Sequence, residues 1–267
     1  MAAWDPSAYL AFAGPRLQPA LDLLAAVDLD GPGNIVDLGC GAGNVTGLLA
    51  ERWPEARITG IDSSPEMLAE ARAAHPEIIW IEADIGAWSA ETPPDLIFST
   101  AALHWLPDHA RLFPRLVESV RPDGVLAVQM PRNFDEPSHT AITEAIDAGP
   151  WRDRLADRRH RRPVAEPDVY RAMLAPLTDR IDVWETVYEH VLEGDDPVVR
   201  WTRSTALRPV LDQLDADEQT AFLVDYAARV GAAYPRRADG TTLFPFCRLF
   251  IIARRYTGPG SRSRDEG

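Results

Sequence analysis

Apolar and polar positions follow two alternating periods along the first half of the chain. Short apolar runs of strand length are separated by stretches with apolar residues at helical spacing, from Asn34 to Met130. The runs predict strands at 35–38, 57–61, 78–83, 95–100 and 125–130, and the stretches between them predict helices at 44–53, 67–74 and 108–120. Because crossovers between consecutive parallel strands are right-handed and carry a helix, this alternation indicates an α/β fold with a parallel sheet.

The pattern changes after Met130. Residues 131–139 form a polar, proline-flanked loop, and helical patterns follow at 140–148, 151–159 and 168–174, with a longer helical stretch at 198–230. Residues 181–191 alternate cleanly between apolar and polar side chains, which predicts a strand with one solvated face, and 243–254 predicts a last strand. Because the two helical insertions flank one strand, we expect them to form a cap at one edge of the sheet.

These elements predict one domain over residues 1–256. We expect its core at about 30–130, 178–193 and 242–256. The helical cap is expected from insertions at about 131–177 and 194–241, together with N-terminal helices within 5–28, the first capped by Asp5 with Pro6 at its first position. Residues 257–267 carry no apolar anchor, which predicts a disordered tail.

Composition narrows the class of protein. With 267 residues, of which 46% are hydrophobic, the chain can bury one substantial core. Its first residues lack the basic and apolar segments of a secretory signal, and no apolar run reaches the roughly 18 residues that span a bilayer, so we expect a cytoplasmic protein with no membrane partner. Cys40 and Cys247 are too few for a zinc site and are not spaced as a redox pair, and we expect no bound metal.

The charge of the chain restricts its partners. A net charge of −14 argues against a nucleic-acid surface, because phosphate binding requires a basic face, and the lack of an apolar stripe favours a monomer. All 27 basic residues are arginines, so an anionic substrate would be bound by guanidinium groups. Six of them lie between Arg152 and Arg162 and favour a solvated helix face, with contact to RNA or an anionic substrate as the alternative.

A glycine-rich turn links the first predicted strand to the first core helix. Gly39, Gly41 and Gly43 stand at every second position, so the backbone N–H groups of the turn can approach a ligand without obstruction from side chains. Asp37 precedes the turn and suits a cationic amine. Two further acids, Asp62 and Asp84, end the next two strands, where they suit a ribose and an adenine amino group. The alternative for these acids is that they are helix N-caps or solvated strand ends. The glycine turn would then be weak evidence for any one nucleotide-like ligand, because nicotinamide-dependent oxidoreductases also carry glycine-rich turns.

The combination of this turn with three ordered acids resembles the S-adenosylmethionine site of the Rossmann-like methyltransferases. The resemblance implies a mostly parallel seven-stranded sheet with an antiparallel last strand and a helical cap. It also implies S-adenosyl-L-methionine as cofactor, with Asp37 and the glycines at its methionine moiety. The remaining expected contacts are Asp62 with Ser63, Asp84 with Ile85, and Ser99 at a strand end. Trp4 and Tyr9 either present aromatic faces to the sulfonium or simply cover the sheet.

The outer segments carry a narrower resemblance, to the trans-aconitate 2-methyltransferases. It rests on Trp4-Asp5-Pro6, Ala101–Trp105, Gln129–Pro131, Val183–Thr186, Tyr234-Pro235 and Phe244–Phe246 before Arg248. The acceptor it implies is a small polycarboxylic acid, methylated on one carboxylate. Cys247 is a departure, since a second arginine is expected beside Arg248. The residues we expect to bind the acid are Trp105, Arg132, Asn133, His139, Arg200, Tyr234 and Arg248.

A carboxylate acceptor needs no general base, because it is already ionised at neutral pH. We therefore expect no catalytic side chain. A different methyl acceptor, such as a phenol, an amine or a carbon acid, would need a base, and His104 or His139 would then be the candidates. A non-catalytic protein that binds S-adenosylmethionine is the remaining alternative.

Overall fold

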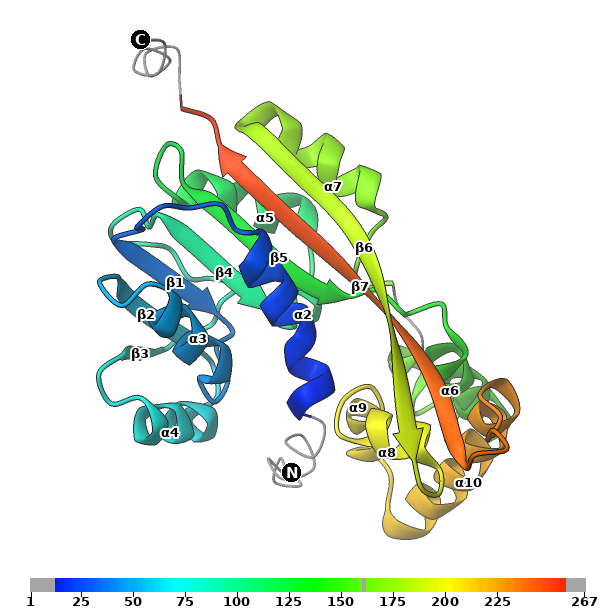
Figure 1. Cartoon of the computed structure of the whole chain (residues 1–267). Helices are drawn as coiled ribbons and strands as arrows, with labels where there is room; N and C mark the ends of the chain where they lie inside the picture. Colours follow the sequence, from blue (N-terminus) through cyan, green and yellow to red (C-terminus); the bar gives the residue numbers. More distant parts are fainter. Residues whose placement is uncertain (1–12, 160–161, 258–267) are drawn as a thin grey trace. The chain divides into compact units, whose positions relative to one another are not determined.

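The computed structural model describes residues 13–159 and 162–257 of the chain (Figure 1). Its strands form a seven-stranded sheet in the order β3-β2-β1-β4-β5-β7-β6. Their bounds are β1 Asn34–Leu38, β2 Arg57–Asp62, β3 Ile79–Glu82, β4 Leu96–Thr100, β5 Val125–Pro131, β6 Thr178–Glu193 and β7 Thr241–Arg255. Strands β1 to β5 pair in parallel, and β7 pairs antiparallel to β5 with Phe250 opposite Gln129. This topology confirms the predicted fold class.

Helices connect the strands and extend the second half of the chain. In the first half they are α2 Ala13–Ala26, α3 Asn44–Arg52, α4 Pro65–Ala74 and α5 His109–Ser119. In the second half they are α6 Pro137–Ala148, α7 Pro167–Leu174, α8 Pro197–Arg203, α9 Arg208–Leu211 and α10 Ala216–Ala233. Local sequence explains the starts of two helices: the Ser64 side chain accepts the Met67 N–H before α4, and Asp215 forms a capping box with Glu218 before α10. The helix predicted to begin at Asp5 lies outside the described residues.

Contacts divide the described residues into two compact units. The sheet unit contains residues 17–131, 163–186 and 248–257, and the helical unit contains residues 13–16, 132–159, 162 and 187–247. In the sheet unit, β1, β4 and β5 are almost entirely buried, as expected of parallel strands covered on both faces. Figure 1 shows α2 in front of this part of the sheet and α5 behind it.

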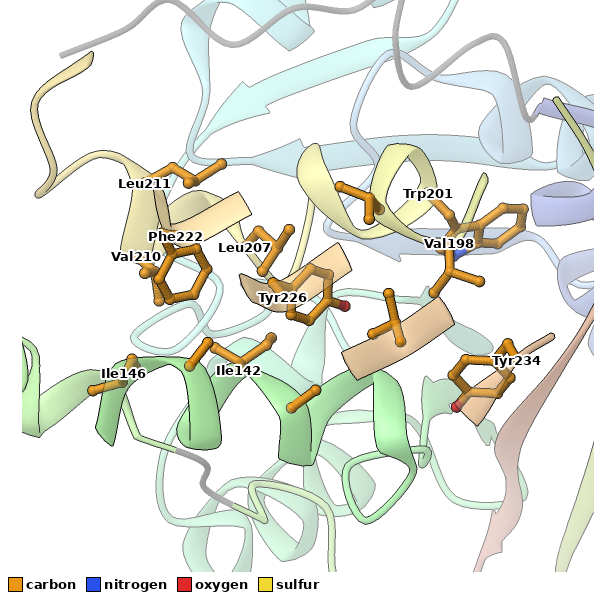
Figure 2. Close-up of a cluster of buried hydrophobic side chains, with 14 of the residues drawn as sticks. Ile142, Ile146, Val198, Trp201, Leu207, Val210, Leu211, Phe222, Tyr226 and Tyr234 are labelled. Atoms are coloured by element: carbon orange, nitrogen blue, oxygen red, sulfur yellow. The ribbon is translucent and has the colours of Figure 1, made fainter. Parts of the chain in front are cut away.

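The helical unit has a core of its own, rich in aromatic rings. Figure 2 shows Ile142 and Ile146 of α6 pointing toward Phe222, Tyr226 and Leu207. The Tyr226 hydroxyl lies in this core and donates to the Ser138 carbonyl oxygen at 2.8 Å. This pairing joins α10 to the start of α6, 88 residues earlier in the chain.

Two local predictions differ from the structure. Residues 151–159 are turns with a short 3₁₀ helix, Ala156–Arg158, instead of an α-helix. Trp151 is the cause, because its indole folds back to donate to the Ala145 carbonyl at 3.1 Å and packs edge-on against Phe222. The helix at 167–174, which we grouped with the cap, belongs to the sheet unit, where Tyr170 packs against Phe113 of α5.

Candidate functional site

The glycine turn leaves β1 at Leu38 and leads into α3 at Asn44. Gly39, Gly41 and Gly43 all have positive φ angles, of 77°, 54° and 83°. A Cβ on Gly39 would overlap the Cβ of Ala102, whereas a Cβ on Gly41 would meet no atom within 4 Å. The first glycine is therefore required by packing, and the second leaves the backbone open to a ligand.

Asp62 holds the open glycine in place. One of its carboxylate oxygens accepts the Gly41 N–H at 2.9 Å and the other accepts the Ser64 N–H at 2.9 Å. Its side chain sits at the end of β2 and is partly exposed. Because each carboxylate oxygen has two lone pairs, both oxygens retain capacity for a further donor, such as a hydroxyl group.

Asp37 is buried beneath the turn and is only 1% exposed. Its Oδ2 accepts the Thr46 hydroxyl at 2.7 Å, while Oδ1 has no partner within the described residues. Burial raises the pKa of Asp37 to about 7, against the Thr46 hydrogen bond, which lowers it, and with a smaller increase from the negative charge of Asp62. An uncompensated buried acceptor of this kind favours a cationic donor from outside the chain.

The remaining residues of the predicted cofactor set differ in exposure. Asp84 is exposed and accepts the Gly86 N–H at 2.8 Å, and Ser63 is also exposed. Ile85 is partly exposed and its Cδ1 lies 3.6 Å from the position of a Cβ on Gly39, which puts it beside the turn. Ser99 is fully buried and donates to the Leu38 carbonyl at 2.7 Å, so its hydroxyl supports the turn from below. Trp4 and Tyr9 lie outside the described residues.

A short 3₁₀ helix, η1 Leu103–Trp105, follows β4. It carries His104, which is buried, and Trp105, which is 61% exposed, with their rings 4.6 Å apart. His109 fixes η1 from α5, because its Nε2 lies 3.0 Å from the Leu103 carbonyl oxygen while its Nδ1 lies 2.6 Å from the Tyr170 hydroxyl. The carbonyl can only accept, so Nε2 carries the proton and Nδ1 accepts from Tyr170. The sequence analysis missed this support, since His109 and Tyr170 are 61 residues apart.

The predicted acceptor residues fall in both units. Arg132, Asn133, His139, Arg200 and Tyr234 belong to the helical unit, and Trp105 and Arg248 belong to the sheet unit. Asn133 is 1% exposed, and both polar atoms of its amide lack a partner within the described residues. Arg248 is buried, at 6% exposure.

Within the helical unit the structure brings two of these residues together. The Tyr234 hydroxyl accepts the Ser138 N–H at 3.2 Å, and the Ser138 Oγ lies 3.2 Å from His139 Nδ1. Arg200 does not join them: it is exposed, donates to the Glu193 carbonyl and lies against Gly194. The structure thus gives Arg200 a contact at the turn between β6 and α8.

A cavity of about 420 Å³ lies in the helical unit, between α8, α10 and the start of β7. Its apolar wall includes Val198, Val199 and Val230. The charged residues that line it are two carboxylates, Asp195 and Asp196, and one guanidinium, that of Arg236. This balance does not suit an acid with several carboxylates.

The arginines of the 152–162 cluster that the structure describes are paired with acids. Arg154 contacts Glu218 at 2.6 Å, Arg159 contacts Asp147 at 2.8 Å and Arg162 contacts Asp135 at 2.6 Å. These pairs agree with a solvated, internally neutralised face. Over the part of the chain that the structure describes, no His, Cys, Asp and Glu side chains gather in a group suited to a metal ion. None of the helices there has the length and apolar character needed to cross a membrane.

Comparison with known proteins gives matches over nearly the whole chain. A family model described as a methyltransferase domain matches residues 35–124, which span β1 to the turn before β5. A trans-aconitate 2-methyltransferase of Azoarcus sp. (strain BH72) is 51% identical over 255 residues, covering 96% of this chain and 100% of that protein. Enzymes of the same name from Methylobacterium nodulans and Streptomyces coelicolor are each 49% identical over 96% of this chain, and cover 99% and 88% of their own lengths.

Solved structures share the fold at low sequence identity. The YcgJ protein of Bacillus subtilis superposes with a TM-score of 0.57 at 14% identity, over 90% of this chain and 99% of that chain. Phosphoethanolamine N-methyltransferase 2 of Haemonchus contortus, solved with S-adenosyl-L-methionine, gives a TM-score of 0.57 at 16% identity, over 93% of this chain and 56% of that chain. These likenesses establish the architecture of the chain.

Proposed function

Because the chain belongs to the trans-aconitate 2-methyltransferase family, we propose that it transfers a methyl group from S-adenosyl-L-methionine to a carboxylate oxygen of trans-aconitate. The products are a monomethyl ester and S-adenosylhomocysteine. The observation that carries the proposal is the 51% identity to a curated enzyme over its full length, which includes the glycine turn and both units of this chain.

The residues of the sheet unit fit the cofactor. The open backbone at Gly41 gives a ligand access to the turn, and the unpartnered Oδ1 of Asp37 suits the cationic amino group of a methionine moiety. Asp62 has acceptor capacity for ribose hydroxyls, and Asp84 with Ile85 would lie at the adenine. When bound, S-adenosylmethionine supplies an electrophilic methyl group on a positively charged sulfur.

The reaction itself needs no proton transfer from the protein. The acceptor carboxylate is ionised at neutral pH, its oxygen forms a bond to the methyl carbon, and the electron pair of the broken carbon–sulfur bond stays on sulfur. The reaction neutralises a carboxylate anion and a sulfonium cation. Because water stabilises the two separate ions, a site that excludes water favours the reaction. The protein's task is to hold the oxygen, the methyl carbon and the sulfur in line, an effect that can account for about 7–11 kcal/mol of barrier.

The carboxylates that are not methylated require donors. Two buried residues support this assignment. Arg248 is a buried cation, which suits a carboxylate held away from water. Asn133 is a buried amide whose oxygen and nitrogen both lack a partner within the described residues. Tyr234 and His139, linked through Ser138, are the next candidates, with Arg132 and Trp105. We also propose that the protein acts in the cytoplasm as a monomer, without nucleic acid.

Methyl transfer from labelled S-adenosylmethionine to a panel of acids tests the proposal. Trans-aconitate, cis-aconitate, isocitrate and citrate are compared side by side, and the product is checked for lability in base. We expect the fastest transfer to trans-aconitate and a base-labile ester. Cofactor binding without transfer to any acid would contradict the acceptor assignment and favour a non-catalytic protein or another acceptor. A pH profile that demands a base would then direct attention to His104.

A further inference from the structure

Asp37 and Thr46 form a buried pair beneath the glycine turn. Thr46 lies in the first turn of α3, is fully buried, and donates its hydroxyl to Asp37 Oδ2 at 2.7 Å. Asp37 comes from β1, so the bond joins the strand before the turn to the helix after it. With Oδ2 engaged in this way, Oδ1 is the oxygen left to a ligand.

The surroundings of Asp37 work against its negative charge. Burial removes the carboxylate from water, and Asp62 at the end of β2 adds a second negative charge. Burial and the negative charges of both acids raise the pKa of the Cys40 thiol in the turn, which keeps this thiol neutral. Arg72 of α4 is a nearby positive charge, and it lowers the pKa of Cys40. The Thr46 hydroxyl is the direct donor to Asp37 and opposes its protonation, because a hydrogen bond to a charged acceptor is stronger than one to a neutral acceptor.

We propose that Thr46 is a positioning residue for cofactor binding, which favours the ionised form of Asp37 and directs its Oδ1 toward the amino group of S-adenosylmethionine. Thr46 thereby sets the lower pH limit of cofactor affinity. The inference rests on the proposed function in one respect, namely that Asp37 meets the amino group. It adds Thr46, which would not contact the ligand itself. Thr46 would determine whether Asp37, which does, is ionised and able to bind the positively charged amino group.

The direction of the pH effect follows from the two groups. Only ionised Asp37 attracts the ammonium group, so affinity falls as the pH falls and Asp37 takes up a proton. Without the Thr46 hydroxyl, Asp37 takes up its proton at a higher pH, and the loss of affinity begins closer to neutrality. The amino group of the ligand itself loses its proton near pH 8, but it does so equally for every variant.

The test is isothermal titration of the full chain with S-adenosylmethionine between pH 6 and pH 9. The quantity compared is the ratio of the variant Kd to the wild-type Kd, in which the titration of the ligand cancels. For Thr46→Val we expect a ratio of about 10 at pH 6 and about 5 at pH 7, falling below about 2 at pH 9. Thr46→Ser restores the hydroxyl and should give a ratio near 1 throughout.

Two further comparisons separate this role from packing. Thr202→Val removes a buried hydroxyl of the helical unit whose hydrogen bonds go to Val198, Val199 and Tyr226, and its ratio should stay near 1 at every pH. Asp37→Asn should bind S-adenosylmethionine weakly, and its affinity should not fall further at low pH through protonation of residue 37. Adding Thr46→Val to Asp37→Asn should leave this Kd unchanged. Circular dichroism confirms that each variant is folded, and Thr46→Ala replaces Thr46→Val if the valine variant is not.

A Kd ratio for Thr46→Val that is the same at pH 6 and pH 9 would overturn the inference and leave Thr46 as a packing residue. A further loss of affinity on adding Thr46→Val to Asp37→Asn would do the same. Wild-type protein that fails to bind S-adenosylmethionine at any pH would instead contradict the proposed function.

Discussion

The sheet unit and the helical unit are specified by contacts of different range. In the sheet unit, the two acids of the cofactor turn bond to residues close in sequence: Thr46 to Asp37 spans nine residues and Gly41 to Asp62 spans 21, although the supporting bond from Ser99 to Leu38 spans 61. In the helical unit, Tyr226 reaches Ser138 over 88 residues and Tyr234 reaches it over 96. The difference teaches that the acids of a cofactor turn can be positioned largely by local bonds, whereas an acceptor region built on long-range packing is free to vary between enzymes with one fold.

The largest expected effect comes from comparing two glycines of the same turn. Gly39→Ala drives a Cβ into Ala102 at a positive φ, and we expect it to lower the free energy of unfolding by about 3 kcal/mol and the affinity for S-adenosylmethionine at least about 100-fold. Gly41→Ala meets open space, so it should cost only about 1 kcal/mol of stability and still lose about 10-fold or more in affinity. Urea unfolding and isothermal titration measure the two quantities. Equal stability losses would show that the turn is not packed in this way.

The next comparison sets a residue of the turn against a predicted acceptor residue. Asp62→Ala removes the acceptor of the Gly41 and Ser64 N–H groups, and we expect it to weaken cofactor binding about 100-fold. Arg248→Ala should leave the cofactor Kd within about 2-fold and raise the KM for trans-aconitate about 10- to 100-fold, since it removes a charge-assisted donor. Steady-state kinetics and titration with cofactor distinguish the two. A loss of cofactor affinity in both variants would refute the assigned division.

The same contrast explains what could be predicted from the sequence. The parallel pairing of β1 to β5, the glycine turn and the start of α4 at Ser64 follow from local periods, glycine spacing and capping residues. The order of the strands in the sheet was not predicted, because a local period does not say which strands become neighbours. The inward role of Ser99 was not predicted, because a strand period does not tell which hydroxyl finds a carbonyl across the sheet. The helix predicted at 151–159 was wrong because Trp151 turns back onto Ala145 and Phe222, a tertiary contact that overrides propensity.

The acceptor residues show the same limit. Arg200 was included for its place in the predicted cap and for the fit of a guanidinium to a carboxylate, and the structure puts its guanidinium on the exposed turn before α8. His109 and Tyr170, which support η1, carry no local pattern that separates them from ordinary core residues. In such cases the sequence does not show which distant residue each side chain contacts, because the fold determines that contact.

A third test uses the cost of the buried charge at Asp37. In the folded protein this carboxyl keeps its proton up to a pKa of about 7, whereas its ordinary pKa is 3.8. Between these values the folded state binds a proton that the unfolded state has lost, so the free energy of unfolding of the cofactor-free protein rises as the pH falls through this window. At pH 8, Asp37→Asn should therefore stabilise the cofactor-free protein by roughly 1–3 kcal/mol while weakening cofactor binding.

Denaturant unfolding without cofactor at pH 5 and pH 8 measures this effect. The gain for Asp37→Asn should shrink toward pH 5, because there the wild-type carboxyl is already neutral in the folded state. A variant that is less stable than wild type at pH 8 would show that the charge of Asp37 is compensated before any ligand binds.

The smallest expected effect comes from the helical unit. Tyr226→Phe removes the hydroxyl that donates to Ser138 and contacts Thr202, and leaves a buried carbonyl oxygen without that donor. We expect the free energy of unfolding to fall by about 1–2 kcal/mol, whereas Tyr256→Phe, at a side chain that is 47% exposed, should change it by less than about 0.5 kcal/mol. Because Ser138 and Thr202, the partners of the Tyr226 hydroxyl, both belong to the helical unit, the Kd for S-adenosylmethionine should stay within about 2-fold of wild type. A large loss of cofactor affinity in Tyr226→Phe would mean that the long-range contacts of the helical unit also determine the cofactor site, and the separation drawn between the two units would fail.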